Sequence, residues 1–275
     1  MLPEPTLTGK GTQHMSHLRF FGSAVLTTLT IAIPTISTGQ TAPSPEWSVI
    51  TSTQIRPEFR MEYEAVQKEI SAAYKKAGVP YRYVVQTILG DVEEYVAIAP
   101  ISKLADMDGP SPLVKALGDA GSQRILRRLG GYIMSVHRVT TLAMNDISIR
   151  TPGDPGEYGQ VTTMRLAPGK GAEFNAFMKD DYLPAMRKAD VANLWVSRPV
   201  FGGDLNERVT VRVMHKLAEL DGGPPTTKAL GAEGAQKLAA KQAHIVESSH
   251  LTVGHLRADL SWMPVPEKPK ATAAK

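Results

Sequence analysis

Cysteine is absent from all 275 residues of the sequence. Its absence excludes disulfide bonds, thiolate metal sites, cysteine nucleophiles and a lipoprotein anchor, but it fits either redox compartment. A strong charge of one sign is lacking too, because 31 basic residues face 27 acidic ones and the formal net charge is +4. There is no basic run and no alternation of basic and aromatic residues. We therefore expect no nucleic-acid partner.

Long hydrophobic runs are also scarce. The uncharged, mostly apolar run Phe20–Ile33 is too short to cross ~30 Å of hydrocarbon as a helix. A weakly positive segment precedes it, Pro34 ends it, and small polar residues follow. This layout predicts a secretory signal peptide that starts near Met15 and is cleaved near residues 39–42, in preference to a buried helix. The expected location is the periplasm or the exterior, with no membrane contact once the signal is removed.

One stretch occurs twice in the chain. Lys103–Gly109 reads KLADMDG, and Lys216–Gly222 reads KLAELDG. The tetrapeptide KALG follows each copy, at residues 115–118 and 228–231. The two copies predict an internal duplication. In each copy the glycine is expected to stop a short helical turn, so the stretch is interpreted as a structural joint.

The patterns on either side of this stretch repeat as well. Alternating apolar residues predict strands over 49–55, 81–89, 95–99 and 134–147, and again over 161–166, around Trp195, over 208–214 and over 247–260. Helices are predicted after Pro57 and Pro112 in the first copy, with an interruption near Gly118 and Gly121, and after Pro168 in the second. The offset between the copies grows from 111 residues (Pro57 to Pro168) to 113 (Asp146 to Asp259), which predicts two one-residue insertions.

The fold class that follows is α+β, with two tandem ferredoxin-like β-α-β-β-α-β repeats that form an α/β barrel. The predicted organisation is an N-terminal extension with signal peptide over 1–42, repeat 1 over 47–149, a linker over 150–157, repeat 2 over 158–263, and a disordered tail over 264–275. Each repeat would leave one sheet face open, and two repeats can cover each other's open faces.

On this element order, and on the Glu-aromatic pairs Glu62-Tyr63 and Glu173-Phe174, the chain resembles the dimeric α/β-barrel superfamily over residues 47–262. That superfamily includes the antibiotic-biosynthesis monooxygenase and NIPSNAP-like families. The resemblance implies a barrel and raises a cofactor-independent monooxygenase as one function. No catalytic motif of these families is matched residue by residue. They build the barrel from two chains, whereas this chain resembles a fused pair that fills the barrel alone or forms a homodimer.

Arginines distinguish the second repeat from the first. Strand alternation predicts that Arg208, Thr210 and Arg212 face the barrel interior, as Tyr95, Ala97 and Ala99 do in the first repeat. Arg165 and Arg198 stand where the first repeat has Gln54 and Gln86. The hypothesis is a basic pocket formed by Arg165, Arg198, Arg208 and Arg212 that binds a small anion. The alternative, common for surface arginines, is a solvated edge where they pair with Glu207, Asp204 and Glu94.

Two histidines and two aromatic residues hold equivalent places in the repeats. His137 and His250 could meet across the barrel as bases, although a structural role is the alternative. No H-x-x-x-H or H-E-x-x-H spacing occurs, so we predict no metal and no cofactor. Tyr83 and Trp195 could line a ligand cavity, or could simply be core.

Three functions remain open on the sequence alone. The leading interpretation is a protein that binds a small molecule, in or at the mouth of the barrel. One alternative is an enzyme resembling the cofactor-independent monooxygenases, and another is a structural or dimerisation domain without a ligand. A binder or an enzyme needs a cavity with convergent polar groups, whereas a structural domain would be filled with aliphatic side chains.

Overall fold

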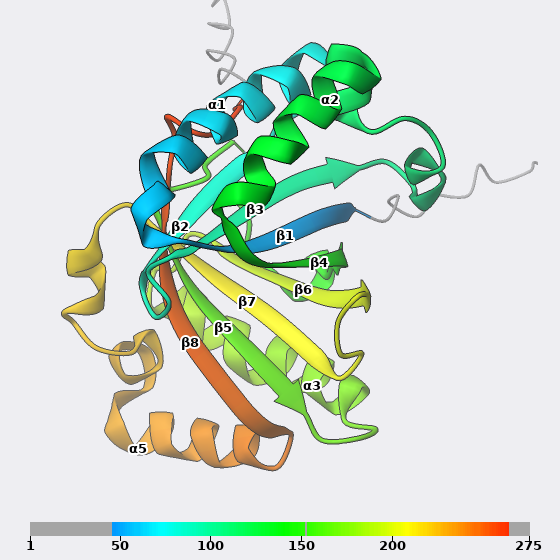
Figure 1. Ribbon diagram of the computed structural model, residues 1–275. Coiled ribbons are helices and arrows are strands. Elements are labelled where there is room, and N and C mark those ends of the chain that lie inside the picture. The colour runs from blue at the N-terminus through cyan, green and yellow to red at the C-terminus, as the bar shows by residue number, and fades with distance from the viewer. Residues whose placement is uncertain (1–45, 152, 264–275) are drawn as a thin grey trace, which may run out of the picture. The chain divides into compact units, whose positions relative to one another are not determined.

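The computed structural model describes residues 46–151 and 153–263. The predicted signal peptide and the predicted C-terminal tail lie outside the described residues. The strands form a closed antiparallel barrel in the order β1-β3-β2-β8-β5-β7-β6-β4 (Figure 1). Within the described part of the chain, no helix is long and apolar enough to cross a membrane.

Each half of the chain runs strand, helix, strand, strand, helix, strand. The first half consists of β1 (Trp47–Ile55), α1 (Arg60–Lys76), β2 (Tyr83–Leu89), β3 (Glu94–Ile101), α2 (Pro112–Tyr132) and β4 (Ile133–Ala143). The second consists of β5 (Tyr158–Leu166), α3 (Gly171–Phe177), α4 (Leu183–Lys188), β6 (Leu194–Phe201), β7 (Glu207–Met214), α5 (Pro225–Ala243) and β8 (Val246–Leu256). Short 3₁₀ turns lie at Pro57–Phe59, Leu104–Met107, Asn145–Ile147 and Leu217–Leu220.

The last strand of each half is shorter than predicted. β4 ends at Ala143, because the chain turns into a 3₁₀ helix at Asn145–Ile147. β8 ends at Leu256, where the amide of Leu260 bonds back to the carbonyl of Arg257. The apolar residues beyond each strand continue the pattern because they pack into the core, not because they extend the sheet.

Two strand pairings join the halves into one barrel. β2 pairs with β8, with Val85 opposite Leu256, and β4 pairs with β6, with Leu142 opposite Arg198. The barrel is therefore closed within a single chain.

The helices lie outside the barrel, with α1 and α2 over the first half and α3 and α5 over the second (Figure 1). Tyr95 is only 1% exposed, and its ring centroid lies 5.1 Å from that of Tyr63 in α1. The predicted facing of the third strands is therefore wrong, since Tyr95 points at the helices and not into the barrel. Alternation separates the two faces of a strand, but both faces are partly apolar in a barrel covered by helices.

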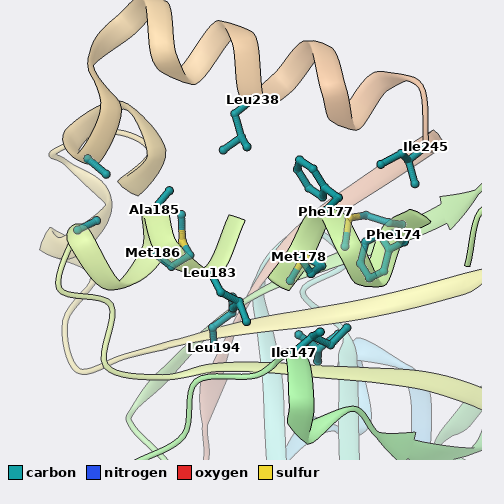
Figure 2. Close-up of a cluster of buried hydrophobic side chains, with 14 of the residues drawn as sticks. Ile147, Phe174, Phe177, Met178, Leu183, Ala185, Met186, Leu194, Leu238 and Ile245 are labelled. Atoms are coloured by element: carbon teal, nitrogen blue, oxygen red, sulfur yellow. The ribbon is translucent and has the colours of Figure 1, made fainter. Parts of the chain in front are cut away.

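The core of the second half lies between its sheet and its helices. In Figure 2, Leu238 of α5 faces Ala185 and Met186 of α4, while Phe174 and Phe177 of α3 lie farther along the same layer. These side chains are all at most 7% exposed. This layer holds α3, α4 and α5 against the barrel and, by doing so, shapes the site described below.

A π-helical turn, Met178–Tyr182, joins α3 to α4. The offset between the copies grows within this segment, from 111 at Tyr63 and Phe174 to 112 at Tyr83 and Trp195. A π-turn is how an α-helix absorbs a single extra residue, and such turns are frequent at functional sites. We therefore assign the first predicted insertion to this turn.

The second helix of each half is interrupted by a glycine. Gly118 in α2 has φ 68° and ψ 175°, and Gly231 in α5 has φ 72° and ψ 175°. This region of backbone space is essentially restricted to glycine. The interruption predicted near Gly118 is thus confirmed, and the same bend occurs in α5.

Candidate functional site

A pocket of about 490 Å³ lies on the helix-covered side of the second half. We call it the outer pocket. It is bounded by β5, β7 and β8 on the sheet side and by the π-turn, α4, α5 and the loop 220–226 on the other. Its polar lining side chains are Gln160, Thr162, Tyr182, Thr210, Arg212, Thr226 and Gln242. The volume is in the range of small-molecule sites, roughly 300–1,000 Å³.

Arg212 supplies the positive charge of the outer pocket. Its side chain is only 12% exposed. One Nη donates to Gln160 Oε1 at 3.4 Å and the other to the Glu219 carbonyl at 3.1 Å, while the Glu219 carboxylate lies 3.9 Å away. An arginine has a fork of N–H donors, so these contacts leave donors for a ligand. Arg212 also ties the 3₁₀ turn that contains Glu219 to the pocket wall.

Tyr182 reaches the pocket from the end of the π-turn. Burial raises the pKa of its phenol, and the nearby charge of Arg212 lowers it to a smaller extent. The phenol therefore stays protonated at neutral pH and can donate a hydrogen bond. It would act as a donor and not as a general base.

Most of the remaining lining of the outer pocket is apolar. Met186, Leu194 and Leu238 form its floor and walls. Leu89 and Leu251 also line it, and they are 57% and 56% exposed. Neither a carboxylate nor an imidazole is found among the described lining residues. The pocket suits a small molecule with an apolar body and an acidic oxygen that faces Arg212.

The four predicted arginines do not form one site. Arg165 is 59% exposed and pairs with Asp204 at 3.1 Å and Glu247 at 3.4 Å, so the solvated-edge alternative holds for it. Arg212 lines the outer pocket. Arg198 and Arg208 occupy a different part of the same sheet face, outside the pocket lining.

The other predicted site residues lie outside the pocket lining. His137 and His250 occupy exposed parts of β4 and β8, opposite Ser52 and Thr163. Tyr83 is half-buried and stacks on Tyr81 with 4.6 Å between ring centroids. Trp195 is half-buried as well. Across residues 46–151 and 153–263, no cluster of three His, Cys, Asp or Glu side chains is arranged to hold a metal ion.

Sequence reasoning missed Tyr182, Gln160 and Gln242. Gln160 and Thr162 are on the helix-covered face of β5, which the pattern did not identify as the binding face. The signal for Tyr182 was the growth in offset before Trp195, but the sequence could not place that insertion within the helix.

Solved structures of other proteins share the fold of this chain at low sequence identity. A proposed monooxygenase from Lactobacillus acidophilus NCFM superimposes with a TM-score of 0.55 and 9% identity, over 80% of this chain and 96% of its own. An anthrone oxidase-like protein superimposes with a TM-score of 0.54 and 12% identity, over 78% of this chain and 91% of its own. A proposed chlorite dismutase, TA0507, superimposes with a TM-score of 0.52 and 10% identity, over 78% of this chain and 96% of its own. The fold is that of the dimeric α/β barrels. Neither a protein-family model nor a curated protein matches the sequence.

The side chains that line the outer pocket do not suit a haem group. Haem iron needs an axial ligand such as histidine, a cysteine thiolate or a tyrosinate. The described lining residues include no histidine, and the sequence has no cysteine. The raised pKa of Tyr182 opposes a tyrosinate. The side chains that line the outer pocket therefore offer no axial ligand for haem.

Proposed function

We propose that this protein is a monooxygenase-like enzyme whose substrate binds in the outer pocket. The observation that carries the proposal is that Arg212 and the neutral phenol of Tyr182 line the same cavity, whose other walls are largely apolar. Support for oxygenation, over binding alone, comes from neighbours of the same fold that are described as monooxygenases and as anthrone oxidase-like.

The proposed substrate is a small aromatic carbon acid whose anion is an enolate or phenolate. Arg212 would stabilise this anion, because an opposite charge at close range lowers the pKa of a bound acid. The substrate proton leaves to water. The electron-rich anion then reduces dioxygen, with Tyr182 donating a hydrogen bond to the developing oxyanion. Overall, a CH₂ group and O₂ give a carbonyl group and H₂O, so atoms and electrons balance without a further reductant.

The test uses a hydroxyanthrone as the probe, with oxygen uptake and quinone absorbance as readouts. We expect turnover by the wild type above the background oxidation, and a loss of at least about tenfold in kcat in Arg212→Gln. Tyr182→Phe should lower kcat by a smaller factor than Arg212→Gln. Arg128→Gln is the matched control, because Arg128 is an exposed partner of Glu69 in the first half. Equal rates in wild type and Arg212→Gln would contradict the proposal.

A second candidate is binding without turnover, which the apolar walls and rim of the pocket also support. Titration of the protein with an anthraquinone in the absence of oxygen separates the two. Binding that depends on Arg212, with no oxygen uptake from the anthrone, would favour a binding protein.

We also infer that the two halves arose by duplication of one ferredoxin-like unit, with relatives among NIPSNAP-like and antibiotic-biosynthesis monooxygenase-like proteins. The repeated KLA-x-x-DG stretch, the common element order and the matched bends at Gly118 and Gly231 support this inference. Export through the predicted signal peptide and further homodimerisation stay predictions.

A further inference from the structure

We propose that the second half carries a separate binding site for a small oxyanion, phosphate or carboxylate, built on Arg198 and Arg208. It lies on the helix-covered sheet face near α3, outside the lining of the outer pocket, and it does not depend on the proposed enzyme activity.

The two arginines are cross-strand neighbours. β6 and β7 are antiparallel, with Val196 opposite Thr210 and Ser197 opposite Val209. The next pair in this register places Arg198 opposite Arg208, on the face to which the buried Val196 belongs. Directly opposed like charges on one sheet face destabilise the sheet unless something lies between them.

The positive charge of this pair has no carboxylate partner in the described part of the chain. Arg208 is only 8% exposed. Its Nη1 donates to the carbonyls of Leu205 at 3.0 Å and Glu207 at 2.7 Å, while its buried Nε has no partner. Desolvation and then the charge of Arg198 lower the Arg208 pKa. Buried charges in proteins are normally paired, so the site calls for an anion.

A second unpartnered polar group lies close by on α3. A Cβ at Gly171 would be 3.2 Å from Arg208 Nη2, so this part of the helix lies against the guanidinium. Asn175 is one turn farther along the same helix face, and its buried Oδ1 has no partner. Turning the amide would present its NH₂ group as a donor to an oxyanion.

The matching site in the first half shows what the second half lacks. There the cross-strand pair is Gln86 and Tyr95. Arg257, which follows β8 and is supplied by the second half of the chain, donates to Gln86 at 3.0 Å and to Glu64, the residue that also accepts from Tyr95. Arg257 binds Glu64 at 2.6 and 2.8 Å and Asp259 at 3.0 Å, and Tyr95 donates to Glu64 at 2.6 Å. By position in the repeats, Gln86, Tyr95 and Glu64 correspond to Arg198, Arg208 and Asn175, and Arg257 corresponds to Met144 at the end of the first half. Carboxylates thus complete the first site, and an external oxyanion would complete the second.

The experiment titrates the whole protein with inorganic phosphate, and separately with acetate, against chloride at equal ionic strength. The readouts are the thermal midpoint and the NMR signals of the arginine Nε–H groups. We expect oxyanions, and not chloride, to raise the midpoint and shift the Arg208 signal, because a ligand that binds only the folded state stabilises it. Arg198→Gln should weaken phosphate binding at least tenfold.

Glutamine is chosen because Gln86 occupies the equivalent place, so the fold accepts it there. Arg165→Gln and Arg128→Gln are controls that should keep the phosphate response, because both arginines already pair with carboxylates. Equal midpoints in phosphate and chloride would overturn the proposal, as would an Arg198→Gln variant with an unchanged response. If all three variants lost the phosphate response equally, the response would reflect general charge screening, and this result would also overturn the proposal.

Discussion

The two halves of the barrel use polar side chains on the helix-covered face in opposite ways. In the first half, Arg82 is 5% exposed and donates to Ser71 at 2.8 Å and Gln67 at 2.6 Å. The equivalent position in the second half is Leu194, a wall of the outer pocket. The backbone supports this equivalence, because Arg82 bridges Trp262 as Leu194 bridges Ile149.

This difference indicates which half carries the function. The polar groups on the helix-covered face of the first half are satisfied by Arg82 and by Arg257, which the second half supplies from the end of β8. The second half instead has a cavity, the Arg212 guanidinium with unused donors, and an arginine pair of which Arg208 is buried. Satisfied polar networks make a structure rigid, whereas unsatisfied buried groups need a ligand or cost stability. We therefore propose the first half as the scaffold and the second half as the binding half.

The largest expected effect comes from breaking the network of the first half. Arg257→Met, which installs the residue found at Met144, should lower the free energy of unfolding by about 3 kcal/mol, because it leaves the partly buried Glu64 without its cation. The two side chains are 19% and 18% exposed. Urea unfolding measures the change. Arg128→Met, at an exposed pair, should cost about 1 kcal/mol or less. Similar losses in the two variants would remove the contrast between the halves.

The same variant has a defined pH dependence. Hydrogen bonds from Arg257 lower the pKa values of Glu64 and Asp259 in the folded protein. A lowered folded pKa adds stability that is complete above the unfolded pKa and is lost as pH falls through the folded value. The gap between wild type and Arg257→Met should thus be full at pH 7 and shrink below about pH 4. A gap that is constant across this range would show that packing, and not charge, carries the effect.

The next effect tests whether the halves bend alike. Gly118→Ala and Gly231→Ala should each cost about 2 kcal/mol, because both backbones occupy a region that only glycine readily adopts. A Cβ at either position meets nothing within 4 Å, so the cost is backbone strain alone. Gly109→Ala and Gly222→Ala, in equally open space without the positive φ, are the controls and should change little. Chemical unfolding of the four variants measures the losses of stability. Unequal losses for Gly118→Ala and Gly231→Ala would mean that the two bends differ.

The smallest expected effect concerns the arginine pair. In buffer free of oxyanions, Arg198→Gln should raise the free energy of unfolding by about 0.5 kcal/mol at low salt, since it removes like charges from opposite strands. High salt should reduce the gain by screening. The measurement is urea unfolding at the two salt concentrations. A loss of stability at low salt would mean that Arg198 makes a favourable contact that compensates its charge.

The sequence predicted most elements of the fold but little of the site. Hydrophobic alternation located the strands, and Pro57, Pro112 and glycine stops located helix boundaries, since these signals depend on local backbone chemistry. Which strand face the helices cover depends on packing between distant segments, so Tyr95 and Arg212 were assigned to the wrong side. The outer pocket needed the π-turn at Tyr182, which no residue pattern reveals. The sequence drew attention to the arginines of the second half, but only the structure separates Arg165, Arg212 and the Arg198–Arg208 pair.

Closure of the barrel within a single chain has a consequence for how the protein can change. In a barrel made from two identical chains, every substitution appears twice, so a helpful residue in one half is forced on the other. Here β2–β8 and β4–β6 pairing joins two halves that differ in sequence. A binding residue can thus be acquired on one side while its counterpart continues to stabilise the fold. Each barrel then offers a single copy of each site, so ligand binding should follow a one-to-one isotherm without cooperativity.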